Sequence, residues 1–453
     1  MNKLFNITEK EPTKFQKFLE AHENFYENFN KIFSHGNSEE IIAFLENFYF
    51  DYPILKNFLP PLYNQLLQYG IVGVANEVAR LYVEANLKIS ELSSSRYDAP
   101  LFCKPYRIEH SLMDMVQQAA FIKIARESEH INQKPVISFD STSPPLPNTA
   151  FIPYLKDSFE VIKLDRKERE SYTEINPISS FFYKFTDQKY GCAGDFFHDC
   201  HNDLAKKGIS SSPFKLKDIT IEKALKFLKD FDFNSTDDFI LLYLNEHNRP
   251  SKINSSLSDV NAFYNMDPSL YIDSIKYLLA RGLKVIFVGN EKSSLVFESY
   301  GFINLSLVKR PGEVDIFLSA KAKFYFGNPC GPYHLASAFG TPCCLTHFIP
   351  YGGVRKNNFI KILQFKYPKT DTFITLKEVK DLGLLGVFDP HVYEMRGLKA
   401  VIPKQEENVN LVSEMLEYLE EGACFRANQS YENKKSNYNI VGGIFSDDLS
   451  LFD

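Results

Sequence analysis

The chain reads KFYFGNPCGPYHLASAFGTPCCLT at residues 323–346. Its aromatic run is typical of a buried parallel strand, and the glycines and prolines that follow predict a sharp turn. From Tyr333 the apolar spacing is helical until Gly340 ends it, and Cys343 then begins another apolar strand. A strand, a glycine-bearing turn and a helix start present backbone N–H groups that suit a phosphate. An ordinary βαβ turn would look the same, so these residues alone leave both interpretations open.

Strands and helices alternate on both sides of this stretch. They are predicted at residues 239–244, 268–280, 285–288 and 314–320. Such alternation indicates a parallel sheet with helices on both faces. Ligands of these sheets bind at the carboxyl ends of the strands. We therefore expect one crevice to be lined by the strand ends at residues 245–249, 289–290, 327–332 and 346–350.

The composition is that of a globular protein with more than one domain. The chain has 453 residues, of which 44% are hydrophobic and 24% charged, so we expect two globular domains. A net charge of −6 gives no reason to expect nucleic acid, which needs a concentrated basic surface. No apolar run has the length of a membrane span, and the first residues lack a signal-peptide core. We expect a cytoplasmic protein and leave open a peripheral contact with the inner membrane.

The sequence pattern of the first half of the chain changes near residue 130, from helical spacing to an α/β pattern. Apolar residues recur at three- and four-residue spacing over residues 12–93, which predicts an α-helical extension within residues 1–130. This extension is interpreted as a cap or as an interface for a protein partner. Residues 131–235 are expected to form a second α/β unit on the acceptor side, where Asp140 follows a short apolar strand. The Rossmann-like alternation and a C-terminal helix occupy residues 236–453.

Two clusters of polar residues do not predict a metal site. The segment KYGCAGDFFHDCHN at residues 189–202 contains two cysteines and two histidines, but their spacing matches no usual zinc pattern. We interpret it as a loop and a helix start. Asp230 and Asp232 close a helix rather than follow a strand, and we interpret them as a solvated helix end.

The order of segments in the second half resembles the donor domain of GT-B glycosyltransferases. The likeness is to a bacterial family of glycosyltransferases known mostly from sequence, and it lies in an ordered series of strand ends and helix starts. The stretches that carry it are LYLNEHNR (242–249), YNMDPSLY (264–271), VIFVG (285–289), VDIFLSAKAKFYFGNPCG (314–331), LTHFIP (345–350), LQFKYPK (363–369) and PKQEENVNLVSEML (403–416). The turn NPCGPYHLA is also similar to the Asp-Ser/Thr-Gly-Pro-x-His-Leu-Ala turn of heptosyltransferases, which faces the nucleotide-sugar donor.

The chain departs from these patterns at four positions. Pro329 stands where the heptosyltransferase turn has an acid. Asn245 and Tyr264 replace arginines of the bacterial family, and His347 replaces an asparagine. Arginines are strong partners of a diphosphate, so their loss bears on activity more than on fold. The candidate substitutes are Arg249, Lys309, Arg310, Arg355 and Lys366.

The resemblance implies an α/β, GT-B-like protein with two Rossmann-like domains facing a cleft and an N-terminal helical extension. It implies metal-independent transfer of a sugar, hexosyl or related, from a nucleotide-activated donor. The implied acceptor is a glycan, a lipid-linked saccharide or a protein, as in the assembly of a bacterial surface glycan. No cofactor is expected besides the nucleotide-sugar substrate. The implied substrate-binding residues are Asn265, Gly289, Asn328, Cys330, Gly331, Pro332, Tyr333, His334 and Lys366.

The expected catalytic residues are Asp140, Glu246 and Arg249. Transfer needs a base for the acceptor hydroxyl, and Asp140 is expected in that role, with Asp195 and His198 as rivals. Glu246 would face the sugar or orient Arg249. Each assignment has a plain structural alternative, which is a solvated ion pair for Glu246 and Arg249, turn geometry for Gly331, helix capping for His334 and a surface position for Lys366.

Two other functions fit the same residues. One is a nucleotide-sugar epimerase or hydrolase, because a fold alone does not fix the reaction. The other is a non-catalytic binding or scaffold protein, which the missing arginines favour.

Overall fold

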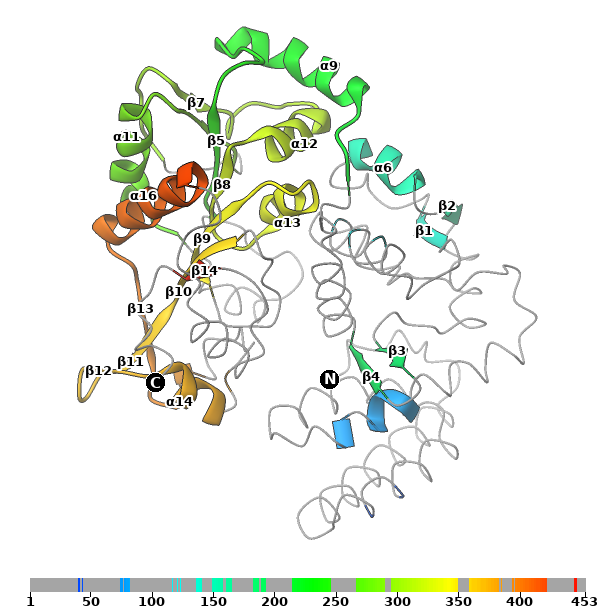
Figure 1. Ribbon diagram of the computed structural model, residues 1–453, viewed down its shortest axis with the longest axis vertical. Coiled ribbons are helices and arrows are strands. Elements are labelled where there is room, and N and C mark those ends of the chain that lie inside the picture. The colour runs from blue at the N-terminus through cyan, green and yellow to red at the C-terminus, as the bar shows by residue number, and fades with distance from the viewer. Residues whose placement is uncertain are drawn as a thin grey trace, which may run out of the picture. The chain divides into compact units, whose positions relative to one another are not determined.

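Figure 1 shows the computed structural model of the chain. The structure describes residues 214–245, 266–289, 295–348 and 358–421, apart from 383, 385–392 and 395. It also describes residues 136–140, 149–157, 160–164, 182–186, 189–192 and 444–445, and isolated helical residues within 40–43, 74–81 and 116–123.

The chain forms two compact units. One contains residues 1–98 and 170–196, and the other contains residues 99–169 and 197–453. In the first unit, β3 (Phe182–Thr186) and β4 (Lys189–Cys192) pair as antiparallel strands. Most of the expected helical extension lies outside the described residues. The predicted domain boundaries near residues 130 and 235 stay predictions.

A seven-stranded parallel sheet forms the centre of the second unit. Its strands are β5 (Phe239–Tyr243), β6 (Lys284–Phe287), β7 (Phe302–Asn304), β8 (Phe324–Gly327), β9 (Cys343–Phe348), β10 (Asn358–Ile362) and β14 (Ile444–Phe445). Their order is β14-β10-β9-β8-β5-β6-β7, and every pair is parallel. The chain runs outward from β5 through β6 and β7, and then returns to the other side of β5 with β8 (Figure 1). The strand order therefore reverses between β5 and β8, which makes this the topological switch point of the sheet.

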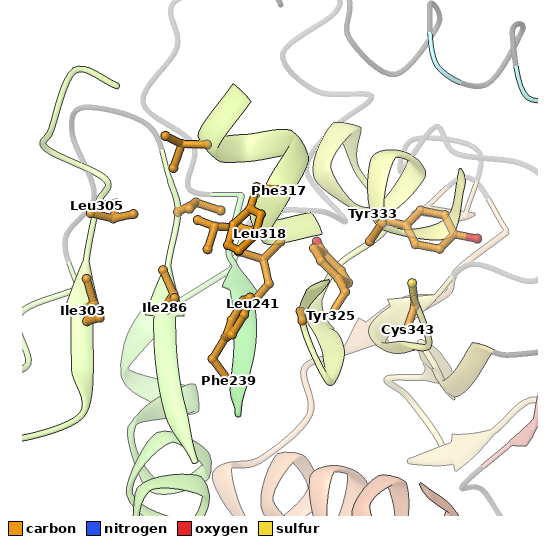
Figure 2. Packing of buried hydrophobic residues seen from close by; sticks show 14 of the residues in the cluster. Phe239, Leu241, Ile286, Ile303, Leu305, Phe317, Leu318, Tyr325, Tyr333 and Cys343 are labelled. Carbon is orange, nitrogen blue, oxygen red and sulfur yellow. The ribbon is translucent and has the colours of Figure 1, made fainter. Parts of the chain in front are cut away.

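Helices cover both faces of this sheet. On one face pack α9 (Asp218–Leu228), α12 (Gly312–Lys321) and α13 (Gly331–Ala338), and on the other pack α11 (Ile272–Ala280) and α16 (Gln405–Glu421). Phe239 and Leu241 of β5 enter the first core, whereas Ile240 and Leu242 enter the second. This alternation follows from the two-residue period of a strand. Figure 2 shows the first core, in which side chains from the strands β5, β6, β7, β8 and β9 meet those of α12 and α13.

The predicted parallel sheet with helices on both faces is thus confirmed. The helix expected at residues 268–280 begins as a short 3-10 turn, η5 (Pro268–Tyr271), and continues as α11. Asp267 caps this turn, because its carboxylate accepts the backbone N–H of Ser269 at 2.9 Å.

A smaller antiparallel sheet follows the carboxyl end of β10. Its strands are β11 (Gln364–Tyr367), β12 (Thr372–Phe373) and β13 (Lys399–Val401), with α14 (Leu376–Asp381) beside them. It has a core of its own, in which the rings of Phe365 and Tyr393 stack with centroids 4.1 Å apart. The lysine-bearing segment expected at residues 363–369 forms the central strand of this sheet.

An α/β segment from the first half of the chain packs on the same unit. Strands β1 (Val136–Asp140) and β2 (Glu160–Leu164) pair in parallel on either side of η2 (Thr149–Phe151) and α6 (Ile152–Lys156). The Tyr154 hydroxyl donates to Thr220 Oγ1 on α9 at 2.8 Å, and its ring contacts Phe214 and Phe339. The start of α9 and the end of α13 therefore hold α6 in place.

Candidate functional site at the switch point

The ends of β5 and β8 are tied together at the switch point. Asn245 follows β5, and its backbone N–H donates to Oδ1 of Asn328, which follows β8, at 3.2 Å. The carbonyl of Asn245 accepts the N–H of Met266 at 3.0 Å. Asn328 is fully buried. Because ligands of open parallel sheets bind outside the carboxyl ends at this point, these residues form the edge of the candidate site.

Gly327 allows β8 to lie against β5 at this edge. Its φ is +147°, and a Cβ built on it would lie 2.0 Å from the carbonyl oxygen of Tyr243 and 3.1 Å from the hydroxyl oxygen of Tyr325. No side chain tolerates such a distance to a backbone atom, so the position requires glycine. The sequence predicted Gly327 only as a breaker of the strand.

Buried polar groups hold the turn after β8. The Tyr325 hydroxyl donates to the carbonyl of Asn328 at 2.8 Å and lies 3.1 Å from Sγ of Cys330. Desolvation raises the pKa of Cys330 to about 12, so the thiol is protonated at neutral pH. Cys330 therefore suits a packing role or a weak hydrogen bond better than nucleophilic chemistry.

The first turn of α13 offers few backbone donors to a ligand. The helix begins at Gly331, and Pro332 has no N–H. The N–H of His334 donates to the carbonyl of Cys330 at 3.1 Å, and the N–H of Tyr333 faces Sγ of Cys330. Within this turn, all of which the structure describes, the N–H of Gly331 is the donor without an assigned partner.

The side chains of Tyr333 and His334 lie mainly in the interior. The hydroxyl of Tyr333 accepts Nδ2 of Asn358 at 2.8 Å, and its ring contacts that of His334 with centroids 4.7 Å apart. Figure 2 shows Tyr333 among the packed residues of the first core, near Tyr325 and Cys343. The Tyr333 ring therefore stabilises the packing of α13, and the predicted contact of Tyr333 with substrate stays a prediction.

Gly289 follows β6 and is tightly enclosed. A Cβ at this position would lie 3.0 Å from Cζ of Phe287 and 3.2 Å from Cβ of Ser306. The packing alone explains the glycine, and its predicted role in making room for a nucleotide stays a prediction.

A chain of buried polar groups ends on β9. The Tyr271 hydroxyl lies 3.1 Å from Sδ of Met266 and 2.7 Å from Oγ1 of Thr346, which lies 3.3 Å from Nδ1 of His347. His347 has a φ of +53° and is 1% exposed. Burial lowers its pKa to about 4, so the imidazole is neutral at pH 7. The sequence marked His347 as a departure, but it gave no sign that Tyr271, 75 residues from Thr346, reaches this strand end.

Two of the predicted substitute cations already have acidic partners. Lys366 lies on β11 and pairs with the carboxylate of Asp371. Nε of Arg310 donates to Asp315 at 2.6 Å, and its Nη1 donates to the carbonyl of Leu305 at 2.7 Å. A bound diphosphate would have to compete with these partners for either cation.

Several predicted residues lie outside the part of the chain that the structure describes. Asp140 is the last residue of β1, for which the structure describes the backbone. The residues outside the description are Glu246, Arg249 and Asn265, together with Asp195, His198, Tyr264 and Arg355. Their predicted roles stay predictions.

Neither a metal cluster nor a membrane span occurs among the described residues. No three side chains of His, Cys, Asp or Glu gather there as metal ligands would. No helix within the described segments is both long enough and apolar enough to cross a bilayer.

Comparisons with known proteins give similarity to solved structures alone. No family model and no curated protein matches the chain. A glycosyl transferase of family 9 from Veillonella parvula aligns with a TM-score of 0.39 and 12% identity, covering 69% of this chain and 95% of that one. The ADP-heptose lipopolysaccharide heptosyltransferase II of E. coli aligns with a TM-score of 0.35 and 11% identity, covering 69% and 97%. The E. coli heptosyltransferase WaaC with ADP aligns with a TM-score of 0.32 and 12% identity, covering 61% and 97%.

Proposed function

We propose that this chain is a glycosyltransferase that binds a nucleotide-sugar donor at the switch point between β5 and β8. The acceptor is a glycan, a lipid-linked saccharide or a protein. Besides the donor and the acceptor, the proposed reaction needs no cofactor or metal ion. The protein would act in the cytoplasm, where a peripheral contact with the inner membrane would bring it to a lipid-linked acceptor.

One observation carries this proposal, which is the close approach of β8 to β5 at Gly327. A Cβ would lie 2.0 Å from the Tyr243 carbonyl oxygen, so the glycine keeps the two strand ends together where a parallel sheet takes its ligand. The turn that follows leads directly into α13 and is the one that resembles the donor turn of heptosyltransferases. Fold and motif therefore point to the same edge of the sheet.

The reaction would exchange one bond at the anomeric carbon for another. The acceptor oxygen attacks this carbon, and the nucleoside diphosphate leaves with the electron pair of the broken C–O bond. A base takes the acceptor proton, for which we propose Asp140. The charge that develops on the diphosphate would be met by the Gly331 N–H and by cationic side chains, for which we propose Arg249, with Glu246 in the proposed role of orienting it.

Isothermal titration of the full chain against nucleoside diphosphates and their sugars tests the donor site. We expect one nucleotide series to bind, and we expect Gly327→Ala to weaken its binding at least tenfold. The matched control is Gly282→Ala, because Gly282 also has a positive φ, of +78°, but no atom lies within 4 Å of its added Cβ. Failure of the unaltered chain to bind any member of the panel would refute the donor site.

A non-catalytic nucleotide-sugar-binding protein is the second candidate. The engagement of Arg310 by Asp315 favours it, because a bound diphosphate would have to compete with that carboxylate for the arginine. Incubation with donor and a range of glycan acceptors separates the two functions. Binding without turnover supports the second candidate, and release of an epimer or free sugar from the donor alone would indicate an epimerase or a hydrolase.

A further inference from the structure

Two buried polar atoms lie unpaired at neighbouring strand ends of the candidate site. Among the residues that the structure describes, four buried side-chain atoms lack a hydrogen-bond partner, and two of them, on Ser274 and Asn408, belong to helices α11 and α16. The other two are Nδ2 of Asn328 and Nε2 of His347. An unpaired buried polar atom destabilises the folded chain, so two at one candidate edge need an explanation.

The sheet register brings these two residues close together. Gly327 of β8 pairs with Leu345 of β9, so Asn328 comes level with Thr346, and His347 follows by one residue. With strands about 4.8 Å apart and a rise of about 3.3 Å per residue, the two backbones lie roughly 6 Å from each other. The register therefore places the two residues at neighbouring strand ends of one edge.

The backbone fixes which atom of Asn328 is free. Its Oδ1 accepts the N–H of Asn245 at 3.2 Å, and a backbone N–H can only donate. The amide is therefore oriented with Nδ2 as the free end, and Nδ2 is a donor.

The chain of hydroxyl groups favours one tautomer of His347. The thioether of Met266 can only accept, so it takes the proton of Tyr271 at 3.1 Å. Thr346 then donates to the oxygen of Tyr271 at 2.7 Å and has no proton left for His347. In this arrangement Nδ1 of His347 donates to Oγ1 of Thr346 at 3.3 Å, which leaves Nε2 with a lone pair as an acceptor.

We propose that Nδ2 of Asn328 and Nε2 of His347 form a donor–acceptor pair that binds ring hydroxyl groups of the ligand, on the ribose or on the transferred sugar. A hydroxyl group both accepts and donates, so it satisfies the pair, whereas a phosphate oxygen accepts alone and would face the lone pair of Nε2. The φ of +53° at His347 fits this role, because non-glycine residues keep such strain mainly at functional sites. This inference rests on the proposed function, since it names the part of the same ligand that the two residues hold.

The test compares ligands that differ by one hydroxyl group. Titrations of the full chain use UDP, its 2′-deoxy and 3′-deoxy forms and UDP-glucose, the four corresponding adenosine ligands, and free ribose and glucose. The variants are Asn328→Asp, which keeps the acceptor for Asn245 but removes the donor, and His347→Asn, which tolerates a positive φ. The matched control is Asn304→Asp at the end of β7, where Oδ1 of Asn304 likewise accepts a backbone N–H, that of Ser306, at 2.9 Å.

We expect the unaltered chain to lose at least tenfold in affinity when the bound hydroxyl group is removed. In Asn328→Asp and His347→Asn, the loss of affinity on removal of the hydroxyl group should shrink to less than threefold, because its side-chain partner is already absent. The control Asn304→Asp should show the same loss as the unaltered chain. A loss with the deoxy nucleotides assigns the hydroxyl group to the ribose. The variants could instead bind UDP or ADP with unaltered affinity but lose the additional affinity that the glucose of the nucleotide sugar provides. In that case the hydroxyl group belongs to the sugar.

Equal binding of all ligands by the variants and the unaltered chain would overturn the inference while leaving the donor site intact. The inference would also be overturned if the variants lost affinity, relative to the unaltered chain, by the same factor for the hydroxyl and the deoxy ligands. Binding of free sugars alone, sensitive to both variants, would keep the inference and refute the nucleotide donor, and no binding of any probe would refute both. If a variant does not fold, the deoxy series on the unaltered chain decides, because equal affinities there contradict a bound hydroxyl group.

Discussion

Replacement of Gly327 by alanine should destabilise the sheet at its switch point. An added Cβ would lie 2.0 Å from the Tyr243 carbonyl oxygen, so β8 must move by about 1.4–2 Å to restore ordinary van der Waals contact. A non-glycine residue at such a φ costs about 1–3 kcal/mol, and forcing atoms into a packed region costs about 1–3 kcal/mol more. We therefore expect Gly327→Ala to lower the free energy of unfolding by about 3–4 kcal/mol.

Urea titration of Gly327→Ala beside Gly282→Ala separates the two contributions. Gly282 has a φ of +78° and nothing within 4 Å of an added Cβ, so its substitution adds only the backbone strain, about 1–2 kcal/mol. The difference between the variants then measures the clash with Tyr243. If Gly327→Ala is no less stable than Gly282→Ala, β8 does not approach β5 as described, and the reasoning that places a ligand there fails with it.

Three further changes test the polar groups of this edge. Tyr271→Phe should lower the free energy of unfolding by about 1–2 kcal/mol in urea titration, because Thr346 loses a buried partner; an unchanged stability would contradict the hydrogen bond. Burial lowers the pKa of His347 to about 4, whereas a histidine in the unfolded chain has a pKa of about 6.5. As the pH falls, the unfolded chain therefore takes up the proton before the folded chain does. The free energy of unfolding should fall between about pH 6.5 and pH 4, by about 3 kcal/mol at most. The difference between the unaltered chain and His347→Asn should therefore shrink across this range, and a constant difference would show that His347 does not titrate as a buried group. Lys366→Met should change stability by less than about 0.5 kcal/mol, because the pair with Asp371 is exposed, whereas a tenfold loss of nucleotide affinity would support its predicted phosphate contact.

The sequence predicted those parts of the fold that depend on local spacing. Aromatic and aliphatic runs gave β5, β6 and β8, because a strand buried on both faces is apolar throughout. The helix at residues 268–280 was predicted with its start slightly simplified, since Pro268 and Asp267 set up a 3-10 turn before α11. Where the periodicity of apolar residues is weak, the sequence did not predict the elements, and the small sheet of β11, β12 and β13 was therefore missed.

The contacts at the candidate site could not be predicted from the sequence. The turn after β8 was recognised from its glycines and prolines, yet glycine is required at position 327 because of its close contact with Tyr243 on the neighbouring strand β5. The link from Asn245 to Asn328 joins residues 83 positions apart, which no local pattern reports. The free N–H groups expected at the start of α13 were also overestimated, because the carbonyl of Cys330 already accepts one of them.

The polar groups of this edge differ in charge from the two arginines that Asn245 and Tyr264 replace. The described edge offers neutral partners, namely the amide of Asn328, the imidazole of His347 and the N–H of Gly331, whereas Arg310 and Lys366 are paired with carboxylates. Neutral groups hold hydroxyl groups well but stabilise a developing negative charge less than a cation does. Recognition of a sugar and activation of its leaving group would therefore depend on different residues in this protein. In the proposed reaction, the strand ends of β8 and β9 would hold the sugar or ribose, and a cation elsewhere in the chain would stabilise the leaving diphosphate.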